Sequence, residues 1–199
     1  MLPRLLLRLV RWLGRSRASG TLVVIRINDR ALPLDRGELY EDPLREMLEA
    51  HGWGEVSGGG SLLSTDGEVE ASDLELILSE VTPEILSTLA NKLEALGAPT
   101  GSRILHEPEV SFGLNEGLAI YLNGTDLPAS TYRDCDSNFV YSEFNRLLAG
   151  LGKIHSHWQG PTETALYVYG RTAAEMRTAL HPFLDSYPLC ERARIVQIA

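Results

Sequence analysis

The sequence predicts an α+β fold of two tandem ferredoxin-like repeats, each with the element order β-α-β-β-α-β and an antiparallel sheet. Two observations predict it. The chain matches itself in the same order along its length, and each half alternates β-branched stretches with amphipathic helical patterns. A chain of 199 residues that is 44% hydrophobic also has enough apolar side chains for a core in each half.

The internal match is clearest where VIRINDRALPLD, residues 24–35, aligns with AIYLNGTDLPAS, residues 119–130. Three further matches follow in the same order: LREML…HG with FNRLL…LG, LELIL with ALYVY, and SRI with ARI. The last two share an offset of 91 residues, and the drift from one offset to the next is explained by loops of different length. The expected organisation is therefore a first repeat at 20–108 and a second at 109–199, with residues 1–19 outside the duplicated fold.

Each repeat carries start and stop signals for its elements. In the first repeat, a strand is expected at 21–27, and a helix follows with Asp42 as N-cap, Pro43 in the first turn and Gly52 as the stop. A hairpin turning at Asp66-Gly67 leads to a second helix that Thr82 caps. The second repeat gives strands at 117–123, 152–159, 164–170 and 192–198, and helices within 136–150 and 172–188.

Charge separates the opening segment from the rest of the chain. The first twenty residues contain five arginines and no acid, whereas the remainder has 13 basic and 27 acidic residues. An acidic surface of this kind repels phosphate backbones, which excludes direct nucleic-acid binding and favours a basic protein partner. The alternative is that the acids serve solubility. Two cysteines without paired spacing indicate a reducing compartment, so we expect a cytoplasmic protein without a structural metal or other cofactor. The excess of arginine over lysine, 16 to 2, is typical of a GC-rich bacterial genome.

Residues 1–19 form a basic amphipathic pattern in which four arginines share one helical face. Arginines interrupt every apolar run, so the segment is too short and too charged to span a bilayer. Three interpretations remain open: contact with a membrane surface, docking on the acidic body, or an extension from an upstream start codon.

The densest polar cluster is KIHSHWQGPTETALYVYG, with His155 and His157 two residues apart on an expected strand. Alternation along a strand places both imidazoles on one face, and Glu163 returns near them after a turn at Gly160-Pro161. Such a group can serve in acid–base chemistry or hold a metal ion. The alternative, which we favour, is two hydrogen-bonded histidines on a half-exposed sheet, with no metal site and no catalytic residue.

The hairpin of the first repeat carries alternating acids beside a glycine-rich SGGGS stretch. Its density of carboxylates makes it the expected contact for a basic partner, through Glu68, Glu70, Asp73 and Glu75. The three glycines predict a bulge or the close approach of another chain to the backbone. In the second repeat, Asp134 and Asp136 flank Cys135; two carboxylates disfavour a thiolate, so capping by Asp136 or Ser137 is expected instead.

Several stretches, among them EGLAIYLNGTDLP, CDSNFVYSEFNRLL, SHWQGPTETALYVYG, YPLCERARIVQIA, GEVSGGGSLL and LEALGAPTGSRI, resemble a family of small, uncharacterised bacterial cytoplasmic proteins. The resemblance covers nearly everything after residue 20 and implies a role akin to immunity proteins that neutralise a basic toxin. It implies no catalytic residues. The first hypothesis is therefore a non-enzymatic protein-binding module, and the alternative is an enzyme or small-ligand sensor that uses a cleft between the repeats with His155, His157 and Glu163.

Overall fold

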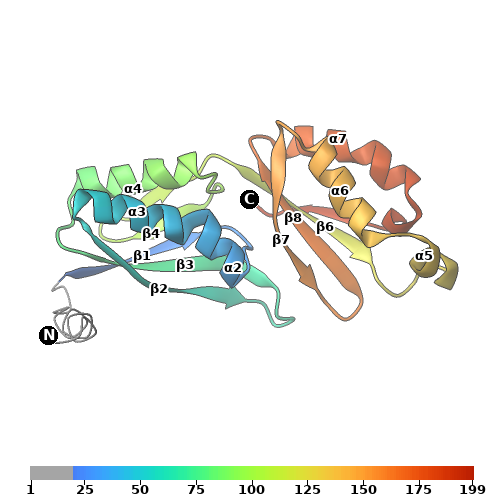
Figure 1. The fold of residues 1–199 in the computed structure, drawn as a ribbon, viewed down its shortest axis with the longest axis horizontal. Coiled ribbons are helices and arrows are strands. Elements are labelled where there is room, and N and C mark those ends of the chain that lie inside the picture. The colour runs from blue at the N-terminus through green and yellow to red at the C-terminus, as the bar shows by residue number, and fades with distance from the viewer. Residues whose placement is uncertain (1–19) are drawn as a thin grey trace, which may run out of the picture.

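The computed structural model describes residues 20–199, which form two antiparallel sheets with helices on them (Figure 1). The first unit contains β1 (Thr21–Ile27), α2 (Pro33–Arg36), η1 (Gly37–Glu41), α3 (Asp42–His51), β2 (Gly54–Leu63), β3 (Val69–Leu78), α4 (Pro83–Ala95), β4 (Ser102–Leu105) and β5 (Val110–Phe112). The second contains β6 (Glu116–Asn123), α5 (Ala129–Asp134), α6 (Ser137–Leu147), β7 (Gly152–Gln159), β8 (Glu163–Gly170), α7 (Ala173–Ser186), η2 (Pro188–Cys190) and β9 (Arg194–Gln197).

Both sheets have the strand order of a ferredoxin-like fold, which confirms the predicted fold class. The order is β2-β3-β1-β4-β5 in the first sheet and β7-β8-β6-β9 in the second. The shared four-strand order places β1 and β6 at equivalent central positions: β1 lies between β3 and β4, and β6 lies between β8 and β9.

The first sheet has one strand more than the second. β5 pairs antiparallel with β4, with Ile104 opposite Val110 and Ser102 opposite Phe112. The chain therefore passes from one sheet to the other between Phe112 and Glu116, a few residues after the division expected at 108 and 109.

The first helical segment begins at Pro33, nine residues before the start expected at Asp42. Pro33 occupies the first turn, where its missing N–H is no loss. The segment then widens into the π-helical turn η1, in which the Asp42 N–H bonds to the Gly37 carbonyl five residues back. This spacing lets Pro43 follow without breaking the helix, which is why a proline that predicts a start lies inside the segment.

Three other local predictions are confirmed. The Thr82 hydroxyl accepts a hydrogen bond from the Ile85 N–H, and the Asp136 carboxylate accepts one from the Asn138 N–H. The glycine-rich strand β2 has a bulge after Val56, and the Arg36 guanidinium donates to the Gly60 carbonyl at 2.9 Å. A Cβ at Gly59 would lie 2.6 Å from the Asp73 carbonyl oxygen of β3, so the close approach of these two strands requires glycine at this position.

Each unit has its own core between its sheet and its helices. In the first unit, α3 and α4 cover one sheet face, and in the second, α6 and α7 do so (Figure 1). The first core is built around these fully buried side chains: Val23, Ile25, Leu44, Leu48, Leu74, Leu76 and Leu89. The helix-free face of the second sheet carries a separate cluster: Ala119, Tyr121, Ala165, Tyr167 and Tyr169.

The expectations about residues 1–19 fall outside the described residues. Within the part of the chain that the structure describes, no helix is both long and apolar enough to cross a bilayer.

We predict that Leu89→Ala lowers the free energy of unfolding by about 2–5 kcal/mol, because it opens a cavity beneath α4 in the first core. Urea unfolding followed by circular dichroism measures the loss. Leu63→Ala is the control, because Leu63 is exposed and its truncation is expected to change stability by no more than about 0.5 kcal/mol. Equal effects of the two substitutions would contradict the assignment of Leu89 to the core.

Candidate functional site

A buried carboxylate joins the two units. Asp29 lies in the loop after β1 and is completely buried. Its Oδ2 accepts a hydrogen bond of 2.5 Å from the Tyr40 hydroxyl of the first unit and lies 2.6 Å from Nδ1 of His155 in the second. The imidazole in turn packs on the Tyr169 ring, with centroids 4.6 Å apart. Oδ2 of Asp29 thus connects both units through buried side chains.

His155 reaches Asp29 because strand β7 contains a bulge. Ile154 pairs with Val168 and Ser156 with Tyr167, so His155 is an extra residue on its strand. Both His155 and Ser156 are buried at the junction, where the Ser156 hydroxyl donates to the Arg30 carbonyl at 2.6 Å. The prediction that His155 and His157 share a face is wrong, because the bulge reverses the alternation and leaves His157 exposed opposite Leu166.

A second polar cluster continues the junction around Glu68. Its Oε1 accepts hydrogen bonds from the Tyr121 hydroxyl at 2.5 Å and the Tyr167 hydroxyl at 2.6 Å, and it forms an ion pair with Arg30. The Arg30 guanidinium also lies over the Tyr167 ring, 5.3 Å from its centroid. The first unit therefore contributes the charges and the second contributes the phenols, so neither unit completes the cluster alone.

Burial and the neighbouring carboxylates keep the junction tyrosines protonated. Burial is the main cause that raises the pKa of Tyr167 far above its usual value, and its hydrogen bond to Glu68 raises it further. Burial followed by the charge of Asp29 raises the pKa of Tyr40 and of Tyr169 in the same direction. Each phenol can therefore remain a hydrogen-bond donor or acceptor with its proton in place.

The other residues expected to form a site are dispersed. Glu163 forms an ion pair with Arg194 at 2.7 Å, and this hydrogen-bonded contact lowers the pKa of the Glu163 carboxyl. It does not join His155 and His157. Among the described residues, no group of three or more His, Cys, Asp and Glu side chains is placed to hold a metal ion.

The acidic hairpin is divided between the inside and the outside of the molecule. Glu68 is occupied in the junction, and Asp73 forms two hydrogen bonds of 2.8 Å with Arg26 across the sheet. Glu70 and Glu75 are exposed. The predicted contact for a basic partner thus retains two of its four acids at the surface.

Sequence reasoning missed Asp29, Arg30 and Tyr40, although one signal was present. In the best-aligned stretch of the two repeats, Asp29 and Arg30 of the first align with Gly124 and Thr125 of the second. Two adjacent charged residues that occur in one repeat only mark a position where the two copies have different environments.

The Asp29–His155 couple has the arrangement that orients a general base, yet both side chains are fully buried, and Oδ2 of Asp29 is shared with the Tyr40 hydroxyl. A pocket of about 490 Å³ borders the couple at His155. Its lining comes from both units: Leu32, Pro33, Leu34 and Asp35 from the first, and Tyr141, His155, Ser156 and His157 from the second. Leu34 is 85% exposed and Tyr141 46% exposed, so the pocket lining includes two large side chains that are accessible from outside.

No model of a known protein family matches the sequence, and no curated protein does either. Among solved structures, the regulatory subunit of aspartate kinase from Thermus flavus is 10% identical with a TM-score of 0.28, covering 82% of this chain and 93% of that one. A putative monooxygenase from Lactobacillus acidophilus is 11% identical with a TM-score of 0.29, covering 89% and 93%. The first two RRM domains of the yeast poly(U)-binding protein are 12% identical with a TM-score of 0.26, covering 90% and 99%.

We predict that Asp29→Ala lowers the free energy of unfolding by about 3–5 kcal/mol, because it leaves the Tyr40 hydroxyl and the His155 ring nitrogen buried without a partner. Asp66→Ala, at an exposed turn, is the matched control and is expected to be neutral. Urea denaturation of both variants measures the difference. An Asp29 variant as stable as the control would show that the junction does not depend on this carboxylate.

We further predict that stability falls as the pH rises above about 10, where tyrosines of the unfolded chain lose their protons. Tyr40, Tyr167 and Tyr169 keep theirs in the folded protein, so unfolding releases protons and alkali favours the unfolded state. Each such tyrosine contributes a slope of up to about 1.4 kcal/mol per pH unit. Urea unfolding across this range should show a shallower slope for Tyr167→Phe; identical slopes for variant and wild type would contradict the assignment.

Proposed function

We propose that the protein is a non-enzymatic binding protein that recognises a basic protein through the face where its two units meet. The observation that carries the proposal is the pocket at the junction, with exposed Leu34 and Tyr141 at its rim and a row of carboxylates beside it. Of the two residues that have the chemistry for catalysis, Asp29 is buried away from this pocket, and His155 lines the pocket with a buried side chain that contacts Asp29.

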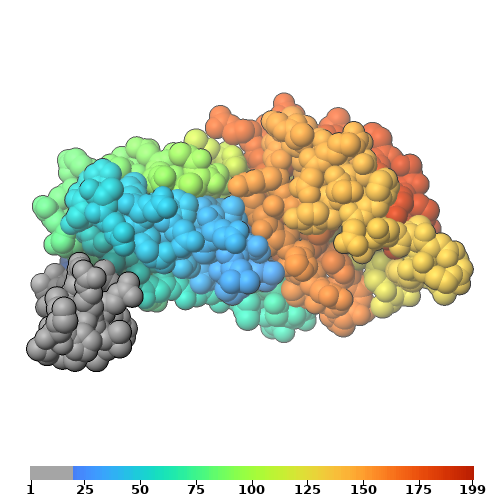
Figure 2. Space-filling model, viewed as in Figure 1, coloured from blue at the N-terminus to red at the C-terminus, as the bar shows by residue number. Residues whose placement is uncertain are grey.

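The row of carboxylates follows the helical segment that carries Leu34. Four acids at intervals of four, four and three residues share one exposed side of it: Glu38, Asp42, Glu46 and Glu49. This spacing places them along one face of a helix. Figure 2 shows this segment, in blue to cyan, meeting the second unit, in orange, on the viewed side of the molecule.

Charge is distributed unevenly between the units. Residues 20–108 hold 17 acidic and 6 basic side chains, whereas residues 109–199 hold 10 acidic and 7 basic ones. A basic partner would be drawn mainly to the first unit, and the excess of acid would accelerate its association. Glu70 and Glu75, exposed on the hairpin of the same unit, add to its negative charge.

An apolar centre with a charged rim is the arrangement found in protein-binding surfaces, where a few buried anchors carry most of the affinity. A partner would insert one apolar or aromatic side chain between Leu34 and Tyr141 and place its basic residues along Glu38, Asp42 and Glu46. A cationic toxin whose active site is occluded in this way is the partner class that fits the proposal best, and such an inhibitor requires no reaction of its own.

The second candidate is a small-ligand sensor that uses the same pocket. Its volume of about 490 Å³ lies within the range of about 300–1,000 Å³ typical of small-molecule sites. Ser156 and His157 supply polar groups at its wall. A ligand there would contact both units and would report on how they are joined.

We predict that two pocket substitutions made together, Leu34→Ser and Tyr141→Ala, abolish capture of the partner, because they remove the apolar anchors without touching either core. The measurement is affinity capture with the tagged full chain from a lysate of the source organism, with quantitative mass spectrometry. Glu38→Lys with Glu46→Lys should also abolish it. Glu80→Lys with Glu84→Lys reverses two exposed acids outside the proposed surface and is the control that should retain it.

A basic protein recovered in stoichiometric amounts by the wild type and the control, and absent from both test variants, would support the proposal. A partner that all four chains capture equally would place the binding surface elsewhere. A small molecule that raises the melting temperature of the wild type but not of the pocket variant would favour the sensor.

A further inference from the structure

The two units differ at one edge of their sheets. In the first unit, β4 is followed by β5, which pairs with it and lies beneath α4. Phe112 of β5 is 6% exposed and belongs to the first core together with Leu86 and Ala90 of α4. In the second unit, β9 occupies the place of β4, and among the described residues no strand pairs with its outer edge.

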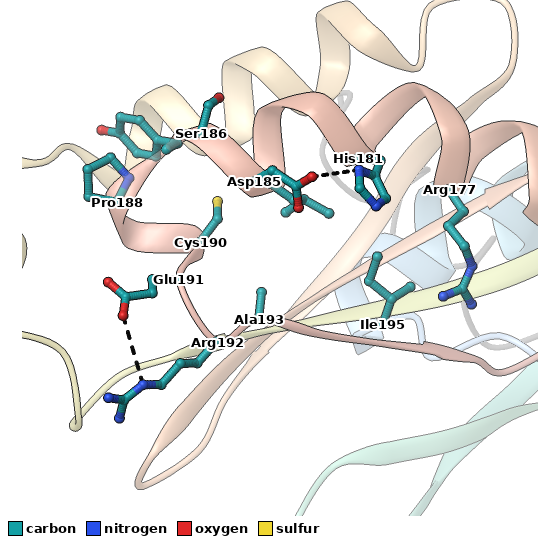
Figure 3. Close-up of a pocket in the computed structure, with 12 residues that line it drawn as sticks. Arg177, His181, Asp185, Ser186, Pro188, Cys190, Glu191, Arg192, Ala193 and Ile195 are labelled. Atoms are coloured by element: carbon teal, nitrogen blue, oxygen red, sulfur yellow. Dashed lines mark ion pairs between the residues drawn. The ribbon is translucent and has the colours of Figure 1, made fainter.

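A groove of about 670 Å³ lies between α7 and the start of β9, lined mainly by α7 and the residues that connect it to the strand. Figure 3 shows Arg177 and His181 on the α7 side of this groove, and Ala193 and Ile195 on the strand side. Ala193 and Ile195 align with Ser102 and Ile104 of β4, the residues that pair with Phe112 and Val110. The edge that binds a strand in one unit is therefore open in the other.

The helix beside the groove, α7, carries different side chains from its counterpart α4. The offset of 91 residues that aligns β4 with β9 also aligns the buried faces of the two helices, for example Leu89 with Leu180. At the same offset, Leu86 and Ala90, which pack with β5, become Arg177 and His181. Both replacements are exposed, and the Arg177 guanidinium carries a positive charge. The apolar helix face that covers β5 in the first unit is thus replaced by a polar one in the second.

The charges in the groove are only partly compensated. His181 pairs with Asp185 at 2.8 Å, and Arg192 lies 4.0 Å from Glu191. Arg177 makes no ion pair with any residue between 20 and 199. At the floor, burial raises the pKa of the Cys190 thiol to about 11, so it stays protonated and offers no nucleophile. The groove is suited to binding and not to chemistry.

We infer that this groove binds an extended, acidic segment of a partner protein, which adds to β9 as an antiparallel strand and directs carboxylates toward Arg177. The backbone of the segment would take the position that β5 takes on β4, and its alternate side chains would face α7 as Val110 and Phe112 face α4. Carboxylates replace those apolar side chains because guanidinium and imidazole replace Leu86 and Ala90. The site lies on the less acidic unit, which suits an acidic ligand and distinguishes it from the proposed surface for a basic partner.

The experiment uses the full chain and a fluorescent synthetic peptide derived from residues 106–114, HEPEVSFGL, with Val110→Glu and Phe112→Glu. Fluorescence anisotropy at physiological ionic strength should show saturable binding to the wild type. Arg177→Glu should weaken it at least tenfold, because a carboxylate then faces the acidic side chains. Arg171→Glu makes the same charge change at an exposed position outside the groove and should leave the affinity within twofold.

Two further peptides separate strand addition from simple attraction of charge. The same acidic peptide with Ser111→Pro cannot complete a strand and should bind at least tenfold more weakly. The unmodified HEPEVSFGL sequence should also bind more weakly, since its apolar side chains would meet Arg177. Equal binding of the proline peptide, equal loss in both arginine variants, or no binding to the wild type would each overturn the inference.

Circular dichroism and sedimentation of each variant complete the test. If a variant has the spectrum of the wild type, its loss of binding can be attributed to the groove. If the wild type forms a dimer that Arg177→Glu dissociates, the occupant is a second copy of this chain, and the inferred partner is wrong.

Discussion

The arrangement of the two units depends on one carboxylate that has no access to water. Asp29 accepts a hydrogen bond from Tyr40 of its own unit and faces the His155 ring of the other, so the same oxygen is needed to satisfy polar groups on both sides. Removing water from a carboxylate is costly unless its partners are fixed in position. That cost opposes any separation or sliding of the units, because every displacement would leave Asp29, Tyr40 or His155 buried without its partner.

The rest of the junction follows from this constraint. The bulge that turns His155 inward also brings Ser156 to the Arg30 carbonyl, and the Arg30 side chain then reaches Glu68 and the phenols of Tyr121 and Tyr167. Tandem repeats joined by a short connection would otherwise be free to reorient. Around Glu68 the charged side chains come from one repeat and the phenols from the other, so this part of the junction is made by what distinguishes the repeats and not by what they share.

This division explains what the sequence could and could not predict. The sequence predicts the strand order, the helix caps at Thr82 and Asp136 and the close backbone approach at the glycines of β2. Each of these features depends on a local pattern of residues. The start at Pro33 was missed because a π-turn accommodates Pro43 inside the helix. The pairing of His155 with Asp29 could not be found, since a bulge has no reliable signature and the two residues stand 126 positions apart.

The same contrast between the repeats explains where binding is expected. A duplicated fold begins with two equivalent sets of edges and faces, and each set is either covered within the molecule or left open to a ligand. The helix-free face of the second sheet is covered by the first unit, and the edge of β4 is covered by β5. The corresponding edge of β9 is open among the described residues, and the helix beside it has Arg and His where its counterpart has Leu and Ala.

An exposed strand edge can pair with other chains, and charged side chains at such an edge restrict which chains can pair. In the binding modes that we propose, Arg177 favours an acidic segment at this edge, and the carboxylates beside Leu34 favour a basic partner. Because the junction around Asp29 joins the two units, both proposed surfaces depend on the same arrangement of the repeats.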